Sequence, residues 1–337
     1  MPKPKMSVET SIIVPCYNEA GTIHLLLDAL YAQTYPRADM EVIIADGGSS
    51  DGTQALIQAW VQDHPDLALR VVENRARIIP AALNVAIRAS RGEYIVRLDA
   101  HSRPDRDYVE RAVAAIVEGC GQNVGGAWDI QPSSTHWIAR SIAAAAGHPI
   151  GVGDARYRYS DQAGFVDTVP FGAFRRELIN QVGFFDETLL TNEDYEFNTR
   201  VRQAGGQIWF DPRIRSVYYA RESLPALARQ YWRYGYWKVQ MLRRYPRTIR
   251  WRQALPPTFV AGLILLVLLA PFLAAARYVL AATVAIYGFI LLMTGIQLGL
   301  RHKSLAFWLG VPLAIACMHF SWGIGFLWGL FSPQKEK

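Results

Sequence analysis

The sequence predicts a mostly parallel α/β sheet flanked by helices and followed by a C-terminal transmembrane helical region. Three observations favour this fold class in the 337-residue chain: short apolar runs alternate with helical patterns, polar clusters follow several of these runs, and the last quarter is strongly apolar. Hydrophobic residues make up 51% and charged residues 19%, against about 25% charged in an ordinary globular chain. This composition excludes a disordered chain and a coiled coil.

Short apolar runs in the first half indicate buried strands, because their length and β-branched content are typical of such strands. They comprise residues 11–15, 41–46, 69–73, 94–99 and 123–128. Helical patterns lie between them: Ile23, Leu26, Leu27 and Leu30 recur at helical spacing, and residues 56–61 carry a similar stripe. This alternation predicts parallel strands joined by right-handed crossovers.

Polar residues follow three of the predicted strands, at 15–19, 46–53 and 99–102. Ligands of open α/β sheets bind at the carboxyl ends of the strands, so these three segments point to one site. Each signal is weak alone, because an acid at a strand end is often a turn or helix-cap residue. Their coincidence carries the prediction.

The acids in these segments suit a nucleotide. The carboxylate of Asp46, in a glycine-rich turn, can accept the N3–H of uracil or the corresponding N–H of guanine. Asp99 is followed two residues later by His101, on the same side of a continuing strand. Since carboxylates repel a diphosphate, an acidic pocket for a nucleoside diphosphate needs a divalent cation between them.

A further acidic group opens a predicted helix at residues 192–204, where Glu193 and Asp194 are adjacent. Acids in a first helical turn oppose the helix dipole favourably, which is the simple structural explanation. The functional alternative makes one carboxylate a general base that removes a proton from an attacking hydroxyl.

The C-terminal part predicts a membrane anchor. Residues 221–253 form a basic, aromatic juxtamembrane segment, with nine Lys or Arg and one acid between Arg221 and Arg252. Such a cluster favours anionic lipid over nucleic acid, since no nucleic-acid-binding motif accompanies it. Residues 254–337 then supply about three spans, at 257–276, 278–300 and 304–331, each long enough to cross the hydrocarbon. Three scattered cysteines indicate a reducing, cytosol-facing catalytic part at residues 1–220.

The motifs SIIVPCYNE, ADGGSSDGT, RLDAHS, TNEDYEF and QYWRY occur in this order over about residues 8–250. The chain resembles family 2 glycosyltransferases of GT-A fold, in which these motifs follow one another. Segments 151–158 and 167–177, with the hydrophobic spans, are most similar to ExoA-type enzymes. Those are glucosyltransferases of bacterial exopolysaccharide (succinoglycan) assembly.

The resemblance implies a role for each matching residue. Asp194 matches the catalytic base, with Glu193 as the alternative. Asp99 and His101 match the metal-binding DxD motif, with His101 in place of the second acid; imidazole suits Mn²⁺, whereas Mg²⁺ prefers oxygen. Gln230 and Arg233 match the acceptor and leaving-group motif, in which Tyr234 replaces a tryptophan. The nucleotide-sugar pocket comprises Pro15, Tyr17, Glu19, Asp46, Arg77, Asn84 and Asp99.

The expected function is therefore an inverting, membrane-bound sugar transfer. We expect glucose from UDP-glucose to pass to a polyprenyl-diphosphate-linked saccharide, with a divalent cation (Mn²⁺ or Mg²⁺) as cofactor. The expected location is the bacterial inner membrane, crossed several times, with the catalytic part in the cytoplasm and polysaccharide-assembly proteins as possible partners. Two alternatives remain: transfer of another sugar directly onto a lipid phosphate, and a catalytically inactive partner of a synthase complex.

Overall fold

The computed structural model describes residues 8–332, and the chain divides into two compact units. The first comprises the residues up to Asp129 together with Ser160–Tyr218, and the second comprises Ile130–Tyr159 together with the residues from Tyr219 onward. Residues 130–159 therefore group with the C-terminal helices, whereas they fall inside the catalytic domain predicted at 1–220.

The first half of the sheet in the first unit is parallel. Its strands are β1 (Thr10–Cys16), β2 (Met40–Asp46), β3 (Ala68–Glu73) and β4 (Tyr94–Arg97), in the order β3-β2-β1-β4. All three pairings among them are parallel. The predicted strands at 11–15, 41–46, 69–73 and 94–99 are thus confirmed, and β1 lies between β2 and β4.

The second half of the sheet is antiparallel, so the sheet is mixed rather than mostly parallel. It contains β5 (Arg103–Pro104), β6 (Asn123–Pro132), β7 (Gly164–Val166), β8 (Ala173–Arg175) and β9 (Ile208–Ala220). The strand β8 pairs antiparallel with both β4 and β6, while β5 and β7 pair antiparallel with β9. The predicted strand at 123–128 exists as β6 and runs in the same direction as β4, but the two strands are not paired, because the short antiparallel strand β8 lies between them.

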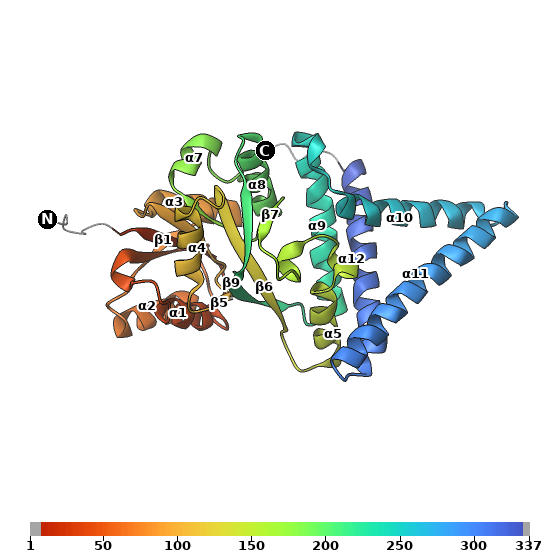
Figure 1. Ribbon diagram of the computed structural model, residues 1–337, viewed down its shortest axis with the longest axis horizontal. Coiled ribbons are helices and arrows are strands. Elements are labelled where there is room, and N and C mark those ends of the chain that lie inside the picture. Colours follow the sequence, from red (N-terminus) through yellow and green to blue (C-terminus); the bar gives the residue numbers. More distant parts are fainter. Residues whose placement is uncertain (1–7, 333–337) are drawn as a thin grey trace. The chain divides into compact units, whose positions relative to one another are not determined.

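Helices cover both faces of this sheet (Figure 1). In the first unit they are α1 (Ile23–Tyr31), α2 (Thr53–Asp63), α3 (Ile79–Ala89), α4 (Tyr108–Val117), α7 (Glu177–Val182) and α8 (Glu193–Gln203), with a 3₁₀ turn at Arg37–Asp39. Alternate residues of β1 such as Ile12 and Val14 join one core with Leu26 of α1 and Val109 of α4. Intervening residues such as Ile13 are equally buried, and α3 packs on β1 and β2. Burial on both faces explains the continuous apolar runs in the sequence.

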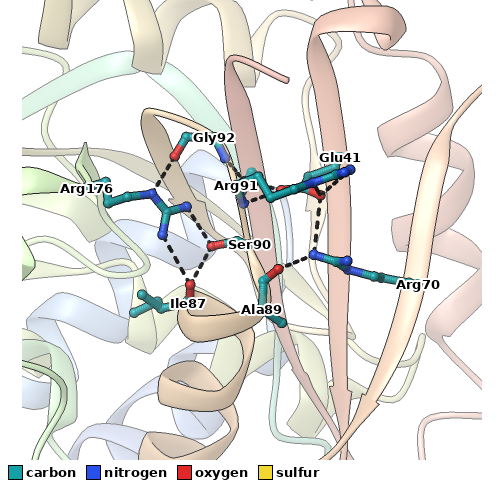
Figure 2. Close-up of polar contacts among 9 residues, drawn as sticks. Glu41, Arg70, Ile87, Ala89, Ser90, Arg91, Gly92 and Arg176 are labelled. Carbon is teal, nitrogen blue, oxygen red and sulfur yellow. Dashed lines mark hydrogen bonds and ion pairs between the residues drawn. The ribbon is translucent and has the colours of Figure 1, made fainter. Parts of the chain in front are cut away.

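A polar network fastens the beginnings of these strands (Figure 2). The carboxylate of Glu41, only 2% exposed, accepts hydrogen bonds from Ser11 Oγ (2.7 Å) and from the backbone N–H of Arg91 (2.6 Å). The guanidinium groups of Arg91 and Arg70 lie 3.2 and 3.6 Å from its Oε2. Burial alone would raise the pKa of Glu41, but these hydrogen bonds and positive charges outweigh it and lower the pKa.

Two arginines of the same region bind carbonyl groups at the C-terminal end of α3 (Figure 2). Arg176 donates to the carbonyl oxygens of Gly92 (2.8 Å) and Ile87 (3.2 Å). Arg70 donates to the carbonyl oxygen of Ala89. The last carbonyls of a helix have no partners within the helix, so the bonds to Ile87 and Ala89 join the end of α3 to β3 and to the residue that follows β8.

The second unit is helical. It contains α5 (Trp137–Ala146), α6 (Pro149–Val152), α9 (Leu224–Arg244), α10 (Trp251–Leu269), α11 (Ala274–Arg301) and α12 (Ala306–Phe331), with 3₁₀ turns at Arg156–Arg158 and Pro246–Thr248. Close packing of α5 on α12 groups residues 130–159 here: a Cβ on Gly310 would overlap the hydroxyl of Ser141. The helices α10, α11 and α12 are long and apolar enough to cross a membrane. The first of them begins at Trp251 rather than at 257, because the helix continues through Pro256 and Pro257.

Several cations of the basic segment have partners inside this unit. Arg250 and Arg252 both pair with Asp154, which follows α6. Lys238 is 1% exposed and donates to the carbonyl oxygen of Thr248 (3.4 Å), and Arg243 donates to the carbonyl oxygen of Ser332 (2.8 Å). Part of the predicted lipid-binding charge therefore holds the helices together.

Candidate active site

The carboxyl ends of β1, β2 and β4 lie side by side, because these strands are neighbours in the sheet. Cys16 at the end of β1 is level with Asp46 at the end of β2, and Ile13 is level with Arg97 at the end of β4. The three polar segments that follow these strands in the sequence therefore leave one edge of the sheet. This arrangement is what the parallel order predicts.

The loop after β1 meets the other two strand ends. The ring of Tyr17, 49% exposed, lies against Gly47 in the loop after β2, where a Cβ would be 3.1 Å from Tyr17 Cδ2. Oε1 of Glu19 lies 3.0 Å from Nδ1 of His101 in the loop after β4, while its Oε2 accepts a bond from Thr22 (2.5 Å). Glu19 thus joins the first loop to the His101 ring.

Asp46 organises its own loop. Its carboxylate is 1% exposed and accepts hydrogen bonds from the backbone N–H groups of Gly48 and Ser49 (both 3.0 Å), from Ser49 Oγ (2.5 Å) and from Gln54 Nε2 (2.5 Å). Burial by itself would raise the pKa of Asp46, but these donors outweigh it and lower the pKa. Three of the four bonds reach Oδ2 and the fourth reaches Oδ1, so the carboxylate fixes the loop, and its predicted contact with a nucleobase stays a prediction.

Arg77 and Asn84 differ in what they contact. Arg77 is exposed and lies over the Asp46 loop, since a Cβ on Gly48 would be 3.3 Å from its Nη2. Asn84 on α3 is buried; its Nδ2 donates to the carbonyl of Phe185 (2.9 Å) and to Glu187 Oε1 (2.8 Å), and its Oδ1 accepts from Phe185 N–H (2.9 Å). These bonds fix the segment that leads to α8.

Arg97 at the end of β4 is the centre of an acidic cluster that sequence reasoning missed. Its side chain is 2% exposed. Nη2 lies 3.1 Å from Asp99 Oδ1 and 2.9 Å from Glu193 Oε1, and Nη1 donates to Asp194 Oδ1. The signal was visible in the sequence, because Arg97 is a charged residue inside a run that otherwise indicates a buried strand.

Asp194 lies in the first turn of α8, at the position that the sequence predicts for the general base. Its second oxygen, Oδ2, accepts a weak bond from the backbone N–H of Phe171 (3.4 Å). Burial raises its pKa to about 7; Glu193 and Asp99 act in the same direction, while Arg97 and the Phe171 N–H act against it. A carboxylate with such a pKa can take up a proton near neutral pH.

Backbone strain concentrates around these loops. Among the described residues, five non-glycine residues have positive φ, and four of them (Asn18, Arg77, Phe171 and Asn192) belong to segments that carry the site. Asn192 (φ 70°) immediately precedes Glu193, and Phe171 (φ 65°) contacts Asp194. Such conformations cost about 1–3 kcal/mol each and are typical of functional sites.

The possible cation ligands are few. Within residues 8–332, no three His, Cys, Asp or Glu side chains converge closely enough to hold a metal ion. Asp99 shares Oδ1 with Arg97, and the Nδ1 of His101 faces Glu19. A carboxylate and an imidazole are ligands that suit Mn²⁺; the metal-binding role of Asp99 and His101 stays a prediction.

Gln230 and Arg233 both lie on α9, in the second unit. They are three residues apart, and therefore on the same side of the helix. Gln230 Nε2 donates to the hydroxyl of Tyr234 (2.9 Å). Their predicted role toward acceptor and leaving group stays a prediction.

Comparison with known proteins identifies the family to which the chain belongs. The family model for glycosyl transferase family 2 matches residues 11–183, more than half of the chain. This chain belongs to glycosyl transferase family 2. The predicted family and the predicted glycosyltransferase activity are thereby confirmed.

Relatives of this family 2 member include the succinoglycan biosynthesis protein ExoA of Rhizobium meliloti, 28% identical over 95% of this chain and 94% of ExoA. A Methanococcus voltae dolichyl N-acetyl-α-D-glucosaminyl phosphate 3-β-D-2,3-diacetamido-2,3-dideoxy-β-D-glucuronosyltransferase is 28% identical over 72% of this chain and 76% of its own length. Among solved structures, the mannosyltransferase PcManGT of Pyrobaculum calidifontis, in complex with GDP-Man and Mn²⁺, superposes with a TM-score of 0.62 at 23% identity, covering 97% of this chain and 89% of PcManGT. This likeness confirms the fold class.

Proposed function

We propose that the protein is an inverting glycosyltransferase that moves glucose from UDP-glucose to a polyprenyl-diphosphate-linked saccharide at the inner face of a bacterial inner membrane. The observation that carries the proposal is the acidic cluster at the carboxyl edge of the sheet. It combines a carboxylate of raised pKa, Asp194, with the loops that match the family's nucleotide motifs. The similarity to ExoA supports exopolysaccharide assembly as the setting.

The donor nucleotide would occupy the edge formed by the first two strand ends. Tyr17 lies against Gly47 and Arg77 against Gly48 of the Asp46 loop, and Pro15 is buried in β1 opposite Ala45 of β2. The ring of Tyr17 offers an exposed face to a base, and the guanidinium of Arg77 offers charge to a diphosphate. Asp46 would accept the uracil N3–H, while Glu19 and Asn84 would support the pocket through His101 and the 185–187 segment.

A divalent cation would be held by Asp99 and His101 together with the diphosphate oxygens. If Nδ1–H of His101 donates to Glu19, the ring presents Nε2 to the ion, an arrangement in which a carboxylate orients a metal-binding histidine. When bound, the cation would neutralise negative charge on the departing UDP.

Transfer would occur in a single displacement. The acceptor hydroxyl loses its proton to the carboxylate of Asp194 while its oxygen attacks the anomeric carbon from the face opposite UDP. The new C–O bond forms as the bond from the anomeric carbon to the β-phosphate oxygen breaks, so an α-linked donor gives a β-linked product. Gln230 and Arg233 would contact the acceptor and the departing diphosphate, with a charge-assisted hydrogen bond from Arg233.

The membrane helices suit a lipid-linked acceptor. A polyprenyl chain stays in the bilayer, and three helices of this chain are apolar and long enough to cross one. The exposed cations of the basic segment, among them Arg229 and Arg247, would contact anionic lipid at the cytoplasmic surface. Polysaccharide-assembly proteins would act on the product.

The test is a donor screen on the full-length chain in membranes that contain polyprenyl-linked oligosaccharides. UDP-glucose, UDP-GlcNAc and GDP-mannose are compared, with Mn²⁺, with Mg²⁺ and with EDTA, and the product is scored by mass. We expect a mass increase of one hexose with UDP-glucose and a divalent cation only. Asp194→Asn should retain UDP binding and lose transfer by about 10²–10⁴-fold; unchanged transfer in this variant, or none in the native chain with any donor, would contradict the proposal.

A further inference from the structure

The only charged side chain of β4 is directed into the protein rather than to solvent. β4 reads Tyr94, Ile95, Val96 and Arg97, and all four residues are buried. Arg97 reaches three carboxylates with its two terminal nitrogens: Asp99 beyond its own strand, and Glu193 and Asp194 on α8. One guanidinium thus connects the end of a central strand to the first turn of a helix more than ninety residues later in the chain.

We propose that Arg97 is the positioning residue of the transfer reaction: its guanidinium holds the carboxyl group of Asp194 in a fixed orientation and separates it from the neighbouring acids. The inference rests on the proposed role of Asp194 as the base. Arg97 is the first residue of the segment RLDAHS, but the resemblance assigns roles in that segment only to Asp99 and His101.

Charge explains why such a residue is needed. Asp99, Glu193 and Asp194 place three acidic side chains in a small, largely buried volume, where like charges repel one another. One guanidinium in contact with all three offsets this repulsion, so Asp194 can keep one orientation beside the other two acids.

Geometry explains why the residue is an arginine. A planar guanidinium offers several N–H donors in fixed directions, whereas a lysine ammonium is a single point charge. Nη1 serves Asp194, and Nη2 serves both Glu193 and Asp99. Within the described residues, the buried Nε of Arg97 has no hydrogen-bond partner. An unpaired buried donor lowers stability, so the side chain is arranged for its contacts with the carboxylates rather than for complete hydrogen bonding.

The experiment compares Arg97→Lys and the double variant Arg97→Gln/Glu193→Gln with the native full-length chain in membranes. The double variant removes one positive and one negative charge, so the net charge of the cluster is unchanged and the protein can fold without excess repulsion. For each protein, kcat, the KM for UDP-glucose and the dissociation constant of UDP are measured. Arg175→Lys is the matched control, because Arg175 is on the strand paired with β4 and contacts the exposed Glu93.

We expect kcat to fall by about 10²-fold in both variants, while UDP binding and the KM change less than threefold and the control is unchanged. A native kcat in either variant overturns the proposal. Loss of UDP binding in parallel with kcat also overturns it, because the role of Arg97 would then be structural. Asp194→Asn is assayed alongside: if it remains active the proposed function fails, and if only the Arg97 variants remain active this inference alone fails.

Discussion

The charge state of Asp194 couples the site to pH. Burial raises the pKa of the Asp194 carboxyl group, although the guanidinium of Arg97 opposes this shift. In the proposed mechanism, only the ionised form of Asp194 accepts a proton from the acceptor hydroxyl. The protonated fraction grows as the pH falls through the pKa, so activity must decrease on the acid side.

We therefore expect kcat/KM for transfer to fall tenfold per pH unit below about 7 and to level off above it. Glu193→Gln removes a neighbouring negative charge, which lowers the pKa of Asp194 and shifts this acid limb to lower pH. The measurement is a pH–rate profile of both proteins at saturating Mn²⁺. If the rate of the native chain fell only near pH 4, where an ordinary aspartate titrates, the buried environment of Asp194 would be contradicted.

The acids of the site could be located from the sequence, whereas their surroundings could not. Strand ends and a helix start placed Asp46, Asp99 and Asp194 because these are local signals. The partners of those acids come from distant segments: Arg97 meets Asp194, and Asn84 meets residues 185–187. No pattern within a window of a dozen residues contains such pairs, so their discovery needed the fold.

Among the elements, β2 depends on a buried acid near its beginning. Glu41 accepts bonds from β1 through Ser11 and from the segment before β4 through Arg91. Replacing it with an apolar residue leaves a buried hydroxyl and a buried N–H unsatisfied. Each unsatisfied group costs about 1–3 kcal/mol.

Glu41→Ala should therefore lower the free energy of unfolding by about 2–6 kcal/mol, seen as a lower midpoint of thermal unfolding of the full chain in detergent. Glu93, which forms an exposed ion pair with Arg175, is the matched control, because Glu93→Ala should change the free energy of unfolding by less than about 1 kcal/mol. Since the folded pKa of Glu41 is lowered, its stabilisation is present above the unfolded pKa and disappears as the pH falls through the folded one. A Glu41→Ala protein as stable as the native one at pH 7 would refute this interpretation.

The predictability of elements follows their length and periodicity. The strands β1 to β4, the helices α1 and α2 and the long helices α10 to α12 carry apolar runs or stripes and were identified. The strands β7 and β8 have three residues each, too few for any period to show. The strand β9 contains Pro212 and two outward arginines, Arg213 and Arg215, which mask its alternation.

At the scale of the whole molecule, the apolar helices set the topology. The turn after α10 contains Phe272, 82% exposed, and the turn after α11 contains the basic residues 301–303. If α11 crosses the bilayer, these turns lie on opposite sides, and we expect the basic turn on the cytoplasmic side, where basic loops are enriched. The grouping of residues 130–159 with these helices was not predictable, since it depends on contacts made more than 150 residues away.

Cysteine labelling tests this arrangement. In a Cys120→Ser background, Phe272→Cys should react with a membrane-impermeant thiol reagent in right-side-out vesicles. Lys303→Cys should react only after permeabilisation, as should Glu118→Cys at the exposed end of α4. Equal labelling of Phe272→Cys and Lys303→Cys from one side would show that α11 does not cross.

The separation of the Glu41 network from the strand ends that carry the chemistry has a practical consequence. Glu41 contributes to thermal stability at the beginnings of the strands, whereas the proposed catalytic residues lie at their carboxyl ends. Selection can therefore adjust stability or turnover with little effect on the other. Stronger arginine contacts around α3 should therefore raise the thermal stability of the enzyme and leave its choice of donor sugar unchanged.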